Sequence, residues 1–113
     1  MKLYSKSHLW IDITGNKARI GMTNLAQERL GDIVFLSLPD VGEQVKIDNK
    51  FGEVESAKTV TELLSMANGT VTSVNDDLVL EPYRINENAD EEWLIEVEVA
   101  ELSKDLTKEE PND

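Results

Sequence analysis

No cysteine occurs among the 113 residues, and His8 is the only histidine. The absence of thiols excludes disulfides, thiolate metal sites and a cysteine nucleophile. It does not distinguish a reducing from an oxidising compartment. A single imidazole excludes a metal site built on two histidines, and a Ser-His-Asp triad would have to use His8. Because this histidine opens a predicted strand, we interpret it as structural.

Aromatic residues are also scarce, at 5% of the chain, so we expect an aliphatic core with Trp10 and Trp93 as its bulkiest members. No apolar run approaches the ~18 residues that a membrane span requires, and residues 1–13 contain no run typical of a signal sequence. A chain of this length suits one domain that buries roughly two thirds of its surface. The sequence therefore predicts a single cytoplasmic domain.

Basic residues are few, and the formal net charge is −12. Most of the imbalance lies in residues 75–113, which contain fourteen acids against three bases. Such a surface repels nucleic acid and anionic membranes, so we expect neither as a partner. Solubility is the ordinary explanation of this charge, and steering toward a basic protein partner is the alternative.

The first regular elements are predicted by hydrophobic periodicity. Apolar residues alternate in residues 9–14 and again in residues 18–22, around a "TGNK" turn, which indicates a β-hairpin. A short helix follows near residues 24–30. Asn24 and Gln27 have the spacing of a capping box at its start, and Gly31 ends it.

Short strands separated by turn residues continue through the rest of the chain. They are expected at 32–38, 43–47, 51–56, 60–65, 69–75 and 93–99. Many short strands and one small helix favour a mainly β fold, a sandwich or flattened barrel. We assign residues 1–100 to this domain and 101–113 to a short helical turn followed by an acidic tail, disordered from residue 107 on because it lacks apolar side chains.

A single lysine, Lys58, lies in the turn between two of these strands, with no other basic residue within seven positions. Its charged neighbours are all acidic: Glu53, Glu55 and Glu62. A Schiff-base lysine needs desolvation or a cationic neighbour, and this turn offers the reverse. Lysines are mostly solvated surface residues, which is the ordinary interpretation here. The alternative is a lysine displayed for modification by another enzyme.

Longer segments around this lysine carry a resemblance to a known family. "GDIVFLSLPDVGEQV", "FGEVESAKTVTELLS" and "GTVTSVN" resemble the H protein of the glycine cleavage system, a lipoyl carrier. "SHLWI", "TNLAQERLGDIVF" and "EEWLIEVEV" extend the similarity to about four fifths of the chain. The most specific part is "GEVESAK" with a glycine eleven residues beyond the lysine. The resemblance implies a lipoyl-domain-like fold, a barrel-sandwich hybrid.

The resemblance also implies a function and its residues. Lys58 would carry covalently attached lipoate, and Glu55 and Gly69 would be recognised by the attaching enzyme, a lipoate ligase or lipoyl transferase. The family shuttles the aminomethyl group of glycine between glycine decarboxylase, aminomethyltransferase and dihydrolipoyl dehydrogenase. Its loaded arm folds back onto the protein surface, which the helix and neighbouring strands would supply here. We therefore expect a non-catalytic carrier, working as a monomer.

The sequence departs from the family pattern at three places. Leu9 occupies the position of a usual glutamate, and Met66 that of a usual proline. The segment "EPYRINENADEEW" lacks the glycines that usually precede the last strand. Two roles within the family therefore stay open. One is full glycine cleavage, and the other is a divergent H-like protein that holds lipoate or relays it to other lipoyl enzymes.

Two classes outside the family also remain. A biotin carrier typically flanks its lysine with methionines, whereas Ala57 and Thr59 flank Lys58 here. An unmodified acidic protein-binding module would leave the lysine as an ordinary turn residue. Replacing Lys58 by arginine should abolish cofactor loading and carrier activity in a lipoyl carrier and should have no such effect in an unmodified module, because only a carrier depends on the amine. The residues that flank Lys58 separate the lipoyl carrier from the biotin carrier.

Overall fold

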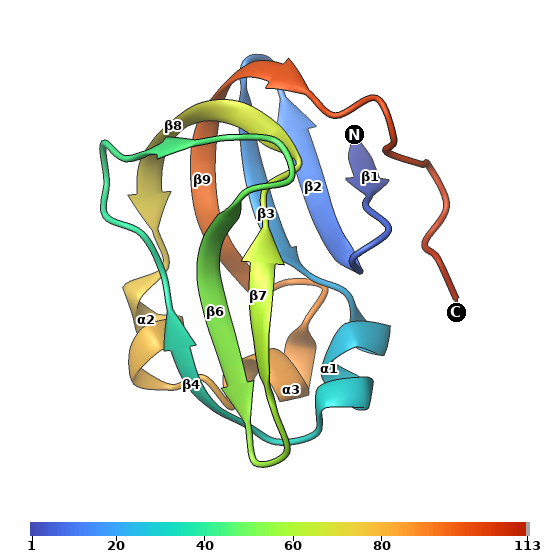
Figure 1. Cartoon of the computed structure of the whole chain (residues 1–113), viewed down its shortest axis with the longest axis vertical. Helices are drawn as coiled ribbons and strands as arrows, with labels where there is room; N and C mark the ends of the chain where they lie inside the picture. The colour runs from blue at the N-terminus through green and yellow to red at the C-terminus, as the bar shows by residue number, and fades with distance from the viewer. Residues whose placement is uncertain (113) are drawn as a thin grey trace.

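The protein forms two antiparallel β-sheets, described here for residues 1–112 by a computed structural model (Figure 1). The six-stranded sheet has the order β1 (Lys2–Tyr4), β2 (Leu9–Thr14), β3 (Lys17–Met22), β9 (Trp93–Leu102), β8 (Ala67–Val74) and β5 (Gln44–Val45). The three-stranded sheet has the order β4 (Ile33–Ser37), β6 (Lys50–Ser56) and β7 (Val60–Leu64). This mainly β sandwich confirms the expected fold class.

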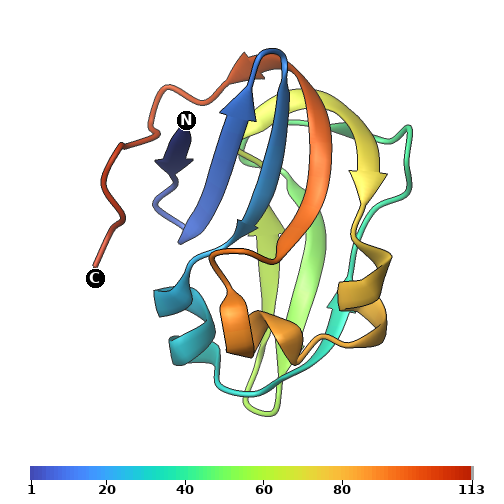
Figure 2. The same ribbon diagram turned by 180° about the vertical axis from the view of Figure 1, so that it is seen from behind.

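Three short helices lie at one end of the sandwich, around the tip of the β6–β7 hairpin (Figures 1 and 2). They are α1 (Asn24–Leu30), α2 (Asp76–Leu80) and α3 (Arg84–Asn88). The expected helix near 24–30 is confirmed, and the other two were not predicted. None of these helices, which are those of the described residues, is long and apolar enough to cross a membrane.

The core lies between the two sheets and is aliphatic, as expected. The prediction that Trp93 belongs to it is wrong, because its ring is only half-buried and carries the guanidinium of Arg19 over its face. Its most deeply buried members include Ile11, Ile20, Leu36, Val54 and Val97. Each side chain of this size contributes about 1.5–3 kcal/mol when it is fully buried. Since these residues come from both sheets, the core fixes the three-stranded sheet, and with it the β6–β7 hairpin, against the six-stranded one.

Trp10 fastens the first hairpin to the end of α3. Its indole is buried and packs on Gly21, where an added Cβ would collide with the ring. The indole Nε1–H donates to the carbonyl of Ala89, just beyond α3, over 3.1 Å. A side chain predicted only as core bulk therefore also positions a helix near the hairpin tip.

The start of α1 differs from the predicted capping box. Thr23, not Asn24, is the N-cap residue, and its hydroxyl accepts from the Ala26 amide over 3.2 Å. Asn24 and Gln27 instead bond through their side chains over 2.8 Å. The prediction that Gly31 ends the helix is confirmed, since it has a positive φ of 79° and its N–H donates to Gln27.

The C-terminal segment also differs from expectation. The helical turn expected at the start of residues 101–113 is wrong, because β9 continues through residue 100 and pairs Leu102 with Ala67. The prediction of disorder from residue 107 on is wrong for Thr107. That residue exchanges two backbone hydrogen bonds with Tyr4 over 2.8 and 2.9 Å. Backbone pairing requires no apolar side chain, so the composition of the tail did not reveal it.

Candidate functional site

Lys58 lies at the tip of the β6–β7 hairpin, as predicted. The two strands pair up to Glu55 and Val60, and the residues between them turn the chain. The Lys58 side chain is exposed, together with its neighbours Ala57 and Thr59. Figure 1 shows this tip as the most extended point of the three-stranded sheet. The amine is therefore open to a large partner from outside.

Ser56 shapes the tip from below. Its buried hydroxyl accepts hydrogen bonds from the amides of Lys58 and Thr59, both over 3.2 Å. The backbone N–H of Ser56 also donates to the Thr59 carbonyl over 2.9 Å. Serine hydroxyls stabilise turns by such local bonds to the backbone. The lysine is thus displayed on an ordered turn rather than on a loose loop.

The tip rests on the linker between α1 and β4. The Ala57 amide donates to the carbonyl of Asp32 over 3.4 Å. A Cβ added to Gly31 would lie 3.9 Å from Lys58 Cε, so the lysine stem passes close over this glycine. The linker therefore supports both the backbone of the tip and the base of the lysine side chain.

Asn86 of α3 holds this linker in place. Its Oδ1 accepts from the Ile33 amide over 2.9 Å. Its Nδ2 donates to the Gly31 carbonyl and to Gln27 Oε1, each over 2.9 Å. One side chain thereby joins α3, α1 and the start of β4 directly beneath the lysine tip.

The structure separates the two expected recognition residues. Glu55 is exposed on β6, beside Phe35 of β4 and Val60 of β7, and lies close to the tip. Gly69 is buried on β8 in the other sheet, where an added Cβ would collide with the carbonyl oxygen of Glu98. Packing between β8 and β9 is thus sufficient reason for glycine at position 69.

A cavity of about 170 Å³ lies beside the hairpin, between α1, β7 and the first hairpin. Its lining is mostly apolar and includes Leu9, Met22, Ala26, Leu30, Val54 and Leu63. Polar groups come from Ser7, His8, Arg29, Thr61 and Glu62. We call this the α1 pocket. Leu30 of its wall precedes Gly31, over which the Lys58 stem passes, so the pocket lies next to the base of that side chain.

His8 lines the α1 pocket in an unusual backbone conformation, with a φ of 64°. Its Nε2 lies 3.4 Å from Nη1 of Arg29. Arginine only donates, so this contact makes Nε2 an acceptor and leaves the proton on Nδ1. In the described part of the chain, Nδ1 is buried without a hydrogen-bond partner. His8 thus has one buried ring nitrogen without a partner in this part of the chain.

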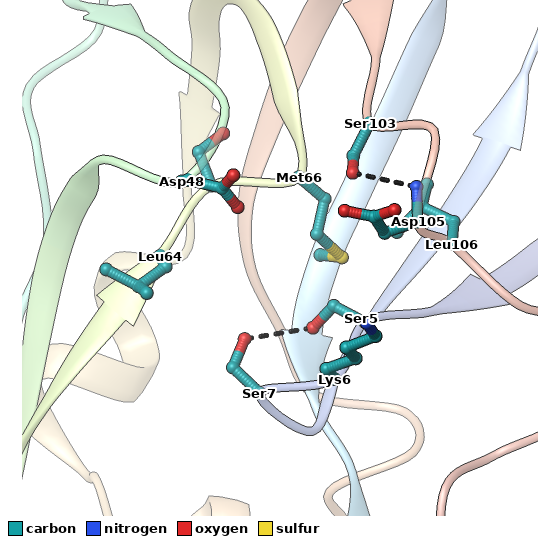
Figure 3. A pocket seen from close by; sticks show the side chains of 10 residues that line it. Ser5, Lys6, Ser7, Asp48, Leu64, Met66, Ser103, Asp105 and Leu106 are labelled. Atoms are coloured by element: carbon teal, nitrogen blue, oxygen red, sulfur yellow. Dashed lines mark hydrogen bonds between the residues drawn. The ribbon is translucent and has the colours of Figure 1, made fainter.

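A second cavity, of about 170 Å³, lies at the opposite end of β7 from the tip (Figure 3). Met66, at the position of the usual proline, points into it. The serines of its wall bond within the chain, Ser5 to Ser7 over 3.0 Å and Ser103 to the amide of Asp105 over 3.2 Å. This cavity lies away from Lys58 and adds nothing to the lysine site.

Comparison with known proteins places the chain in a family. A model of the glycine cleavage H-protein family matches residues 2–111. The chain belongs to the glycine cleavage H-protein family. The match covers the hairpin tip and the α1 pocket as well as the core, so it is not confined to the β scaffold. The resemblance found in the sequence is therefore confirmed.

Individual relatives agree with this assignment. The glycine cleavage system H proteins of Bacillus velezensis and Bacillus subtilis are 52% and 51% identical over 102 residues, which are 89% of this chain and 80% of theirs. The crystal structure of a glycine cleavage system H protein from Mycobacterium marinum matches with a TM-score of 0.89 at 38% identity. The match covers 94% of this chain and 88% of that one.

Proposed function

We propose that this chain is a lipoyl carrier of a glycine cleavage system, with lipoate attached to Lys58 through an amide. The observation that carries the proposal is the display of Lys58 on an ordered, exposed hairpin tip. Membership of the H-protein family supports it. The attached group would supply the redox and carbon-carrying chemistry, while the protein supplies position and tether.

The residues at the tip suit attachment by a separate enzyme. Lys58 and its two neighbours are exposed, so the amine can enter the active site of a lipoate ligase or lipoyl transferase. Glu55 is exposed beside the tip and would be part of what that enzyme recognises. Gly69 is buried in the other sheet, so we assign it an indirect role in keeping β8 against β9.

The α1 pocket fits the arm at rest. Its apolar wall matches the hydrocarbon chain and dithiolane of lipoate, and β7 of the lysine hairpin forms part of that wall. We propose that the arm folds into this pocket between visits to the partner enzymes, which are glycine decarboxylase, aminomethyltransferase and dihydrolipoyl dehydrogenase. A tethered arm is present at high effective concentration at each partner to which the carrier docks. In this cycle the chain is a non-catalytic subunit.

One observation favours a second candidate within the family. Leu9, at the position of the usual glutamate, is buried and forms part of the α1 pocket. The pocket then offers a protonated aminomethyl group only the carboxylate of Glu62, which is itself exposed. Since burying an unpaired charge is costly, such a pocket suits the uncharged arm better than the loaded one. A carrier that holds or relays lipoate to other lipoyl enzymes would need only the uncharged arm.

A reconstituted glycine cleavage assay tests the main proposal. The lipoylated wild type should support glycine-dependent turnover, and Lys58→Arg should support none. Lys50→Arg is the matched control, because Lys50 belongs to the same hairpin and pairs with Glu53 over 2.8 Å. Full turnover by Lys58→Arg would contradict the carrier role. A lipoylated wild type that is inactive in this assay but loads a second lipoyl domain would instead establish the relay role.

A further inference from the structure

A groove of about 450 Å³ lies on the other flank of the hairpin from the α1 pocket. Its wall comes from β4, the following loop, the end of β8 and α2, and we call it the β4–α2 groove. β4 and β7 are opposite edges of the three-stranded sheet, so the groove and the α1 pocket lie on either side of the lysine hairpin. Figures 1 and 2 show α2 beside β4 at the end of the molecule that displays the tip.

The groove exposes large apolar side chains that a soluble domain usually buries. Phe35 is 58% exposed, Val41 63% and Val79 40%. Leu80, which follows Val79 in α2, is 80% exposed. Grouped exposed apolar residues mark interaction surfaces, whereas single ones need no explanation. These grouped apolar side chains therefore indicate a surface that binds another molecule.

A strand irregularity brings two of these side chains to the surface. β4 shifts its register against β6 between Ile33 and Phe35, so Val34 and Phe35 are both exposed instead of alternating. Bulges of this kind re-aim side chains, often next to functional sites. Phe35 lies beside Glu55, which is one residue from the start of the tip. The exposed face of β4 is thus continuous with the lysine site.

The charged residues that line the groove are all acidic. Asp40 and Asp76 line it, and Asp77 and Glu81 follow on α2 and its C-cap. No lysine or arginine is among its lining residues. The nearest arginine along the chain, Arg84, already pairs with Glu81 and Glu92. An apolar centre with an acidic rim is complementary to an apolar side chain surrounded by lysines or arginines.

We infer that the β4–α2 groove is the docking surface for an enzyme that acts on the Lys58 arm, through a patch with an apolar centre and a basic rim. The inference rests on the proposed carrier function. Docking on this flank leaves the α1 pocket uncovered, so the arm can leave its resting place while the partner stays bound. Most of the excess acid of the chain lies in the segment that contains α2. This placement favours steering toward a basic protein partner over solubility as the explanation of the net charge.

Steady-state kinetics of lipoylated carrier with glycine decarboxylase and with aminomethyltransferase test the inference. Phe35→Ser combined with Val41→Ser, and separately Asp40→Asn combined with Asp76→Asn, should raise the KM for the carrier about tenfold with at least one enzyme and leave kcat unchanged. The wild-type KM should rise with salt, and the double-Asn variant should respond less. Glu98→Gln, an exposed acid on β9, is the control and should behave as wild type.

The opposite results are distinguishable. KM values within twofold of wild type for both groove variants and both enzymes would overturn the inference while leaving the carrier function intact. A wild type that dimerises in sedimentation, and becomes monomeric in the Phe35 variant, would assign the groove to a second copy and overturn the docking role. Absence of lipoyl attachment to Lys58 would overturn the proposed function, and the inference with it. The altered side chains are exposed, so the variants should keep the wild-type melting temperature.

Discussion

Asn86 donates a hydrogen bond to the carbonyl of Gly31, directly beneath the lysine that the hairpin displays. The contact joins residues 55 positions apart, and it belongs to a set of three bonds from one side chain. The acidic segment that departs most from the family pattern therefore contains the residue that holds the base of the tip. The position of Lys58 therefore depends on contacts between α1, α3 and the linker beneath the hairpin tip.

Asn86→Ala should remove all three hydrogen bonds and lower the free energy of unfolding by about 1–3 kcal/mol. The reason is that its partly buried backbone and side-chain partners are left without a hydrogen bond. It should also slow attachment of lipoate to the folded protein, since the linker under Lys58 loses its support. Chemical denaturation and the rate of mass increase measure the two effects. Asn88→Ala, an exposed neighbour in α3, is the matched control. Unchanged stability in Asn86→Ala would show that the linker between α1 and β4 keeps its conformation without the hydrogen bonds of Asn86.

Ser56→Ala should loosen the tip without disturbing the sheets. The Lys58 and Thr59 amides lose their acceptor, so their hydrogen exchange should accelerate while exchange in the β6 and β7 ladder stays slow. We expect a loss of about 1 kcal/mol in the free energy of unfolding, typical of one hydrogen-bonded hydroxyl. Thr61→Ala, exposed on the same hairpin, is the control. Equal exchange in both variants would mean that the turn does not depend on the serine.

Gly69→Ala separates packing from recognition. The new Cβ would collide with the Glu98 carbonyl, and overpacking of this kind costs about 1–3 kcal/mol. Denaturation should show that loss, while the lipoylation rate of the folded fraction stays at the wild-type value. Ser73→Ala, on the same strand, is the control for substitution in β8. A variant of wild-type stability that fails to accept lipoate would instead make Gly69 a direct recognition residue.

Tyr4 provides a pH-dependent test of the tail. Burial raises the pKa of its phenol above 10.0, and the nearby carboxylates of Glu110, Asp90 and Asp12 raise it further. The folded chain thus holds the phenolic proton more tightly than the unfolded chain. The associated stability is fully present below pH 10 and is lost as pH rises through the folded pKa.

Removing residues 107–113 deletes Glu110 and the two bonds between Tyr4 and Thr107. The Tyr4 pKa should move back toward 10, as followed by phenolate absorbance against a Tyr83→Phe background. The melting temperature should fall by a few degrees, because backbone pairing at β1 is lost. A truncated chain with an unchanged Tyr4 titration would show that the tail does not lie against β1 in solution.

The sequence predicted the features that depend on local pattern. Alternating apolar residues predicted the first hairpin and the last strand, and Gly31 predicted the end of α1. Lys58 was placed at a tip because two strand-like segments flank it. These signals are local in the chain, so they could be recognised without knowledge of the tertiary structure.

The features that were missed depend on contacts between distant segments. α2 and α3 have five residues each, too few for periodicity, and they are held by buried Leu78 and Ile85. The role of Asn86 and the buried ring nitrogen of His8 become visible only when α1, α3 and the first hairpin meet. Ser56 was the exception, since a serine at the start of a turn could have been recognised as its acceptor. The helical turn expected after residue 100 was overruled by pairing of β9 with β8.

The most direct test of the central claim is the intact mass of the chain after coexpression with a lipoate ligase and lipoate. The wild type should gain the mass of one lipoyl group, and Lys58→Arg should gain none while Lys50→Arg gains one. The ligase must be active on a second acceptor in the same cells. A wild type without the increment, or a Lys58→Arg variant that still acquires it, would contradict the assignment of Lys58 as the lipoyl-bearing residue.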